Sequence, residues 1–277
     1  MIPPAELGEL EAFSSLLDGQ PQAEIGGAVC TSFEAAPGSA LFNRALGLGL
    51  AEPATEATLD EIDAFFRARG LAYGIPLTPD AQPPELPEWL EARGFQRGYA
   101  WTKFARRAEP TNDLDHLRGS TLRVEEVAAD RAGVFADVFL RAYGVPEVAR
   151  PLLERVAGSD GWRCFVAFDG DTPAATGALF VTGSLAWVGA GGTLPEFRRR
   201  GAQGVLLAAR IEAGIAAGCE TLVTRPASRS RESPGTRTGT SSAPASSRST
   251  SGRTTSRRRT PTPPERARET RARSVSQ

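Results

Sequence analysis

One stretch of the chain carries the residue types of a phosphate site, because glycines and three successive arginines stand directly before an amphipathic helix. The stretch runs from Gly191 to Gly204, GGTLPEFRRRGAQG. Glycine allows a ligand close to the backbone, the first amides of a helix have no partner within it, and the helix dipole adds positive potential there. Neighbouring arginines can add charge-assisted bonds to phosphate oxygens. The pattern predicts a pyrophosphate site, and the competing interpretation is a basic turn that only caps the helix.

The periodicity of the surrounding sequence places this stretch between a strand and a helix. Two other phosphate loops are excluded, because the chain has no GxxxxGK[ST] and this turn has no GxGxxG. Alternating apolar residues in three segments predict an antiparallel meander, and a helical repeat follows the basic turn. The expected elements are a strand at 120–127, helices at 130–143 and from Pro146, strands at 162–168, 174–182 and 185–191, a helix at 202–217 and a strand at 220–224.

This order of elements, together with the turn, resembles the GNAT superfamily of acetyltransferases over residues 120–224. The family's acetyl-coenzyme A motif is Arg/Gln-x-x-Gly-x-Gly/Ala, and Arg198, Gly201 and Gln203 stand in its three slots. Gln203 departs from the motif, and Gly204 behind it is expected to supply the flexibility. The resemblance implies that the backbone of Gly192, Thr193 and Leu194 pairs with the pantetheine arm, and that the amides of Arg199, Arg200, Gly201, Ala202, Gln203 and Gly204 hold the pyrophosphate. No metal is expected.

The resemblance leaves the catalytic residues unassigned. Members of the superfamily often carry a glutamate base on the strand before the loop, but residues 185–191 contain no acid. The nearest carboxylates are Glu154, Asp160 and Glu196, and an ordinary surface position is the favoured interpretation for each. The tyrosine that commonly protonates the leaving thiolate in this family would lie on a helix that begins near residue 230. There this chain consists mainly of Arg, Ser and Thr.

The first half of the chain predicts a second domain of similar fold. Strands are expected at 23–32, 39–46, 71–77 and 99–104, and helices at 59–69 and 86–93. Their order resembles the last third of the GNAT fold without a basic glycine loop, so this domain is expected to shape the substrate cleft and to bind no coenzyme. The fold class is α/β, with two tandem GNAT-like domains of mixed, mostly antiparallel sheets: a degenerate domain at 1–107, a linker at 108–119 and a truncated acetyl-coenzyme A-binding domain at 120–224.

The composition changes abruptly after Thr224. Residues 225–277 contain 13 arginines, 3 glutamates and no Leu, Ile, Phe, Tyr or Trp, so a tail of formal charge +10 follows a body of −11. Such a segment cannot bury enough apolar surface to fold, and the tail is predicted to be disordered.

The tail is also predicted to be an out-of-frame translation. A shifted frame permits TGEPVAGEPGHAYRNILRAGF over 226–246, which contains a helix-compatible run and a tyrosine at the expected place. As written, the chain would lack the last helix and strands of the domain and would leave an open sheet edge beside residues 220–224.

Other features exclude several function classes. Cys30, Cys164 and Cys219 have neither metal-ligand nor disulfide spacing and are expected to be buried thiols, the single histidine, His116, lies in the linker, and no apolar run is long enough to span a membrane. A cytoplasmic protein without a membrane partner is expected.

The sequence predicts an N-acetyltransferase that moves an acetyl group from acetyl-coenzyme A to an amine of a small molecule, a protein N-terminus or a lysine, with its activity impaired in this chain. One alternative is a noncatalytic relic that binds coenzyme A. Another is a binder of nucleic acid or another polyanion through the tail, which is disfavoured because the tail has no aromatic side chain.

Overall fold

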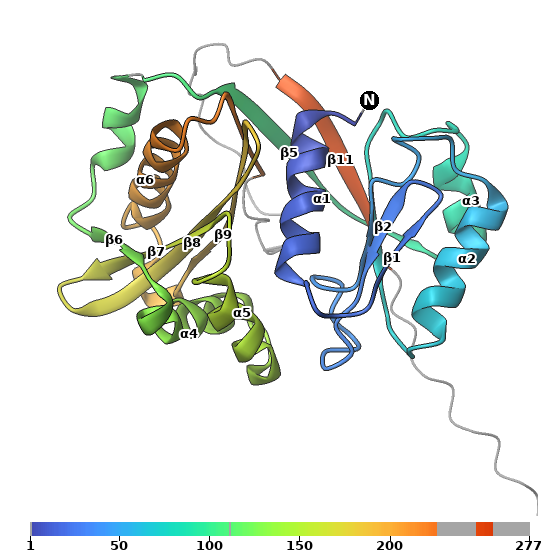
Figure 1. Ribbon diagram of the computed structural model, residues 1–277, viewed down its shortest axis with the longest axis horizontal. Helices are drawn as coiled ribbons and strands as arrows, with labels where there is room; N and C mark the ends of the chain where they lie inside the picture. The colour runs from blue at the N-terminus through green and yellow to red at the C-terminus, as the bar shows by residue number, and fades with distance from the viewer. Residues whose placement is uncertain (1, 111, 226–247, 257–277) are drawn as a thin grey trace, which may run out of the picture.

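The computed structural model describes residues 2–110, 112–225 and 248–256, and its described strands form one continuous sheet. The order across the sheet is β1-β2-β3-β4-β11-β5-β10-β9-β8-β7-β6. Figure 1 shows two α/β halves side by side, the first in blue and cyan and the second in green to orange. The pairs β3 with β4 and β9 with β10 are parallel, and the other neighbouring pairs are antiparallel. The predicted fold class, α/β in two halves with mixed and mostly antiparallel strands, is confirmed.

The second half is a meander with helices on both faces. Its strands are β6 (Arg123–Val127), β7 (Trp162–Asp169), β8 (Thr172–Thr182), β9 (Leu185–Thr193) and β10 (Thr221–Thr224), and its helices are α4 (Ala132–Tyr143), α5 (Arg150–Val156) and α6 (Ala202–Ala216). Successive side chains of a strand point to opposite faces. On β7, Cys164 and Val166 therefore belong to the core under α4 and α5, whereas Phe165 and Ala167 belong to the core under α6.

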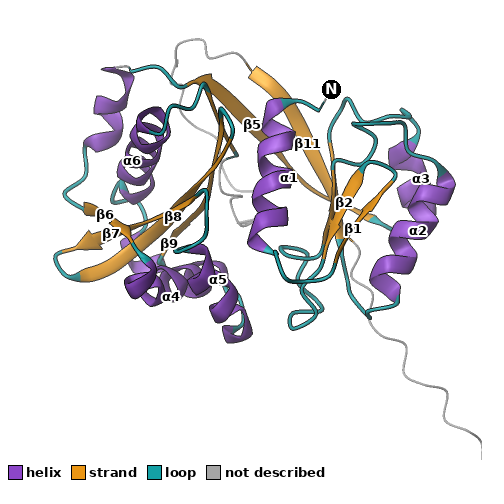
Figure 2. Cartoon of the chain, in the orientation of Figure 1, coloured by secondary structure: helices purple, strands orange, loops and turns teal. Residues whose placement is uncertain are grey.

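The described residues of the first half form five strands and three helices, and its first two strands are a short hairpin. Its elements are α1 (Pro4–Leu16), β1 (Gln22–Ile25), β2 (Ala28–Thr31), β3 (Arg44–Leu46), α2 (Glu56–Arg67), β4 (Gly74–Leu77), α3 (Leu86–Ala92) and β5 (Gln96–Arg107). Helices α2 and α3 share a core of their own with the strands. Helix α1 lies between the two halves in Figure 2. Its Phe13, and Leu17 directly after the helix, belong to the same core as Phe135 and Trp187 of the second half.

The long strand β5 joins the halves. Its end pairs with β10, from Phe104 opposite Thr224 to Arg107 opposite Thr221, while β10 pairs with β9 on its other side. The expectation of an open edge beside residues 220–224 was therefore wrong, because the first half supplies the missing neighbour.

The linker and the tail also differ from expectation. Within the linker, η1 (Asn112–Arg118) is a 3-10 helix whose Leu114 packs into the core of α6. Within the tail, the structure describes one strand, β11 (Arg248–Ser256), which lies between β4 and β5 and was not predicted. Residues 226–247 and 257–277, on which the predictions of disorder and of an altered reading frame mainly depend, lie outside the described residues.

Candidate active site

The turn between β9 and α6 presents a row of backbone amides to the outside. Within the described part of the chain, none of the amides from 199 to 203 donates a hydrogen bond, and the helical pattern starts at Gly204, whose amide donates to the Gly201 carbonyl at 2.9 Å. Arg199 and Gly201 have positive φ angles of 64° and 78°. Left-handed residues in such a turn, at the positive end of a helix, create concave anion sites. The turn therefore has the donors that a phosphate group needs.

The two glycines of this turn have different roles. Gly201 provides the left-handed backbone, and a Cβ atom there would lie 2.9 Å from Cβ of Ser120. A Cβ atom on Gly204 would lie 2.8 Å from the carbonyl oxygen of Leu117 in η1. Gly204 thus allows η1 to pack on α6, a reason unrelated to the flexibility expected of it.

The three arginines of the turn are exposed but differ in their contacts. Arg200 pairs with Asp169 at 2.8 Å and stacks on the ring of Phe197. Arg198 donates to the Thr193 carbonyl at 3.4 Å. Arg199 forms no ion pair or hydrogen bond within the described residues. Of the three guanidinium groups, that of Arg199 is the most accessible to an anion at the amides.

Gln203 lies along the edge of β9 beyond the point where β10 stops pairing. Its side-chain amide donates to the Gly192 carbonyl and the Thr193 hydroxyl, each at 3.1 Å, and β10 pairs with β9 only as far as Val188. Leu194 is buried, and its amide already donates to the Ala174 carbonyl at 3.0 Å. A pantetheine arm at 192–194 would therefore compete with Gln203 for the Gly192 carbonyl.

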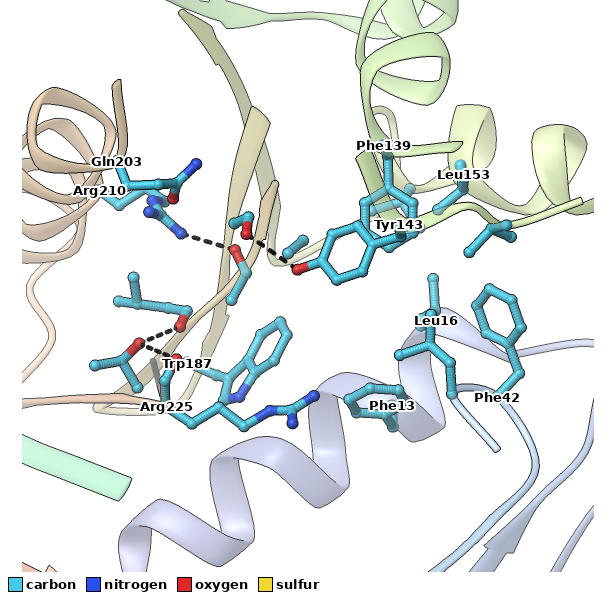
Figure 3. A pocket seen from close by; sticks show the side chains of 18 of the residues that line it. Phe13, Leu16, Phe42, Phe139, Tyr143, Leu153, Trp187, Gln203, Arg210 and Arg225 are labelled. Atoms are coloured by element: carbon cyan, nitrogen blue, oxygen red, sulfur yellow. Dashed lines mark hydrogen bonds between the residues drawn. The ribbon is translucent and has the colours of Figure 1, made fainter. Parts of the chain in front are cut away.

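A cavity of about 1250 Å³ begins at this edge and extends between the two halves. Gln203 and Arg210 of α6 line one end, whereas α1 and the loop before β3 provide the opposite wall through Phe13, Leu16 and Phe42 (Figure 3). Volumes of roughly 300–1,000 Å³ are usual for small-molecule sites, so this cavity has room for a sizeable ligand.

Two polar side chains reach into the cavity and contact the bulged part of β9. Arg210, which is only 4% exposed, donates to the Gly189 carbonyl at 2.7 Å, and burial lowers its pKa to about 10. The Tyr143 hydroxyl donates to the Gly191 carbonyl at 3.1 Å, and desolvation raises its pKa. Figure 3 shows both side chains directed at β9 from opposite sides. The motif pointed to neither residue; the only signal for Tyr143 was its place directly before the Gly144 that ends α4.

None of the three carboxylates considered from the sequence lies at the cavity. Glu154 pairs with Arg150 and Glu196 pairs with Arg141, both on the surface. Asp160 lines a separate hollow between α1 and α5. The exposed His116 does contribute to the cavity wall.

A buried ion cluster fastens α1 beside the cavity. Lys103 Nζ lies 2.6 Å from carboxylate oxygens of both Glu6 and Glu9, and the guanidinium groups of Arg44 and Arg225 lie 3.2 and 3.3 Å from Glu9. Burial favours a high pKa for Glu9, but the three cations outweigh it and lower the pKa to about 2. For Glu6 burial prevails and its pKa is raised.

The cysteines of the described residues form neither a disulfide nor a metal site. All three cysteines are buried free thiols, as predicted. In the described ranges, no three His, Cys, Asp or Glu side chains gather as metal ligands, and no helix there has the length and apolarity to cross a membrane.

Part of the chain matches a known protein family, and most of the chain resembles solved structures. Residues 102–224 match the family described as "Acetyltransferase (GNAT) domain". A GCN5-related N-acetyltransferase from Kribbella flavida is similar in structure, with a TM-score of 0.58 at 16% identity over 92% of this chain and 96% of that one. A conserved protein of unknown function from Staphylococcus epidermidis follows at 0.55 and 12% identity, over 86% and 94%. No protein with a curated description matches the chain.

A tandem GNAT protein of the clavulanic acid biosynthesis pathway is also similar, with a TM-score of 0.49 at 15% identity over 82% of this chain and 87% of that one. Residues 102–224 thus match a GNAT acetyltransferase domain, and the fold of most of the chain is that of a GCN5-related N-acetyltransferase. Acyl transfer is the activity of this family.

Proposed function

We propose that this chain transfers an acetyl group from acetyl-coenzyme A to an amine. The observation that supports this most is the run of amides from 199 to 203 that donate to no described acceptor, at the start of α6 and next to the cavity. These amides and the Arg199 guanidinium would hold the pyrophosphate. The coenzyme would supply an acetyl thioester, and its pantetheine arm would extend along β9 past Gln203.

The buried cation of Arg210 fits the charge changes of such a transfer. It contacts the Gly189 carbonyl and no carboxylate of the described residues, so a negative charge that develops nearby would be stabilised without reorganisation.

The Tyr143 hydroxyl lies on the same stretch of β9. A tyrosine hydroxyl is protonated at neutral pH, and desolvation raises the pKa of this one further, so it can donate a proton to the leaving sulfur. The amine would enter from the cavity, where both halves of the chain form the walls.

Calorimetric titration with acetyl-coenzyme A tests the coenzyme site. Gly201→Val forces a β-branched side chain into a left-handed backbone and against Ser120, so coenzyme affinity is expected to fall roughly tenfold or more. Gly218→Val is the matched control, because Gly218 follows the other end of α6 with the same φ of 78° and open space around its Cβ position. Equal affinity in the two folded variants would disprove the assignment.

A coenzyme-binding protein without catalytic activity is the second candidate. It is favoured by the absence of an acidic side chain among the described residues that line the cavity. It also fits the proposal that an altered tail impairs activity. Tight acetyl-coenzyme A binding without turnover on any amine would select this candidate.

A further inference from the structure

The part of the cavity between the halves is an apolar chamber, which we define by Phe13, Leu16, Phe42, Phe139, Leu153 and Trp187. The first three come from the first half of the chain and the others from α4, α5 and β9. Phe13 and Trp187 meet edge to face at 6.0 Å between ring centres. Figure 3 shows these side chains around the space that the Tyr143 ring enters from α4. The chamber is therefore continuous with the polar end of the cavity.

The charged groups around the cavity all have the same sign. Its described lining includes Arg44, Arg106, Arg210 and Arg225 but no aspartate or glutamate. Glu9 contacts Arg44 and Arg225 but is only 1% exposed and also pairs with Lys103. Placing a cation in an apolar space without a carboxylate is costly. A ligand with a second positive charge would not fit this chamber.

We infer that the chamber binds a bulky apolar group, aryl or alkyl, that carries no positive charge of its own. This inference rests on the proposed function and assigns the group to the body of a monoamine acceptor. The guanidinium of Arg210, which contacts no carboxylate of the described residues, would lower the pKa of an ammonium bound near it, so the reactive neutral amine is favoured there without a carboxylate base. The same apolar chemistry would suit a long acyl chain on the coenzyme, and the experiment separates the two sources.

The first arm measures binding of hexylamine and of 1,6-diaminohexane to the full chain by calorimetry. The two probes match in length and differ in one terminal ammonium. Hexylamine is expected to bind roughly tenfold tighter or more. The second arm compares hexanoyl-coenzyme A with acetyl-coenzyme A. If the acyl chain occupies the chamber, each buried methylene makes hexanoyl-coenzyme A bind more tightly than acetyl-coenzyme A. Hexylamine then binds no more tightly than 1,6-diaminohexane.

Leu16→Trp provides the structural control, because the larger side chain fills the chamber from α1. It is expected to weaken hexylamine binding about tenfold. Leu7→Trp is its match: Leu7 is a half-buried leucine of the same helix that packs on the same core but does not line the cavity. Thermal melting of both variants confirms that each is folded.

The outcomes separate this inference from the proposed function. The chamber is supported if hexylamine binds more tightly than 1,6-diaminohexane, or hexanoyl-coenzyme A more tightly than acetyl-coenzyme A, and if Leu16→Trp removes this difference while Leu7→Trp keeps it. The pair of compounds that shows the difference identifies the source of the apolar group, even if acetyl-coenzyme A itself fails to bind. Normal acetyl-coenzyme A binding with neither preference would overturn the chamber and leave the proposed function standing. Tighter binding of 1,6-diaminohexane than of hexylamine would also overturn it.

Discussion

Two side chains outside the coenzyme motif supply the polar atoms nearest to the bulge of β9. Arg210 and Tyr143 donate to carbonyls two residues apart, Gly189 and Gly191. Ala190 between them has a positive φ of 53°, so the strand is bent where the two side chains converge. Gln203 donates to the next carbonyl, that of Gly192. Arg210 and Tyr143 therefore lie where the turn before α6 meets the chamber.

The Tyr143 hydroxyl is the atom whose removal tests this chemistry. Tyr143→Phe keeps the ring that stacks on Phe139 but removes the proton donor, so kcat should fall about 100-fold with little change in KM for acetyl-coenzyme A. Steady-state kinetics measure both constants. Tyr73→Phe is the control, because that tyrosine packs in the core of the first half. An unchanged kcat in Tyr143→Phe would exclude it as the proton donor.

Helix α1 owes its position to two buried glutamates as well as to apolar packing. Its Glu6 and Glu9 both pair with Lys103 of β5. Glu9 also pairs with Arg44 of β3 and with Arg225, which directly follows β10. One helix thus bonds to two strands of the first half and to the residue that follows β10 in the second. The chamber wall that α1 provides depends on this cluster.

Acid should weaken the cluster in a defined pH range. The pKa of Glu9 is about 2 in the folded chain against 4.5 ordinarily, so ionised Glu9 adds stability above about pH 4.5 that is lost as the pH falls toward 2. Glu6 has a raised pKa and an effect of opposite sign, which offsets part of this loss. Urea unfolding should show that Glu9→Gln costs about 3–5 kcal/mol at neutral pH, the usual cost of breaking a buried ion pair.

The pH dependence of that cost is the decisive control. Because protonation removes the same charge as the substitution, the difference between the native chain and Glu9→Gln should shrink between pH 4.5 and pH 3. A difference that stays constant over this range would show that packing, and not charge, explains the loss.

At the scale of the molecule, the sheet runs through both halves without a break. Strand β5 pairs with β10 of the second half at one end and with β11 along most of its length. Strand β11 belongs to the Arg-rich tail, and β10 ends directly before that tail begins. A change in the amino-acid sequence of the tail would therefore alter the part of the sheet where the two halves meet.

Restoring the other reading frame tests the origin of the tail. Inserting or deleting one base near the Thr224 and Arg225 codons should replace the tail by a sequence with a tyrosine-bearing helix. Acetyl transfer and solubility are expected to rise, and a rise in rate of about 100-fold would assign the proton transfer to that tyrosine in place of Tyr143. Robust turnover by the present chain, or an early stop codon in the shifted frame, would contradict this prediction.

Much of the second half could be predicted from local patterns. The meander, α4 and α6 lie within a few residues of their expected bounds, because strands buried on both faces and amphipathic helices carry their period in the sequence. The turn before α6 followed from Gly201 and its arginines for the same local reason. Helix α1 was missed, because its buried residues include Glu6 and Glu9 and no apolar stripe marks it.

The amino-acid sequence by itself determined the resemblance of the second half to the GNAT family, the turn before α6 and the abrupt change of composition after Thr224, since each depends on neighbouring residues. Only the tertiary structure decided that β5 covers β10, that Gly204 makes room for η1, and that Phe13 and Trp187 share a chamber. These are contacts between residues about 90 to 170 positions apart. They depend on how two halves pack, and no periodicity within either half encodes that arrangement.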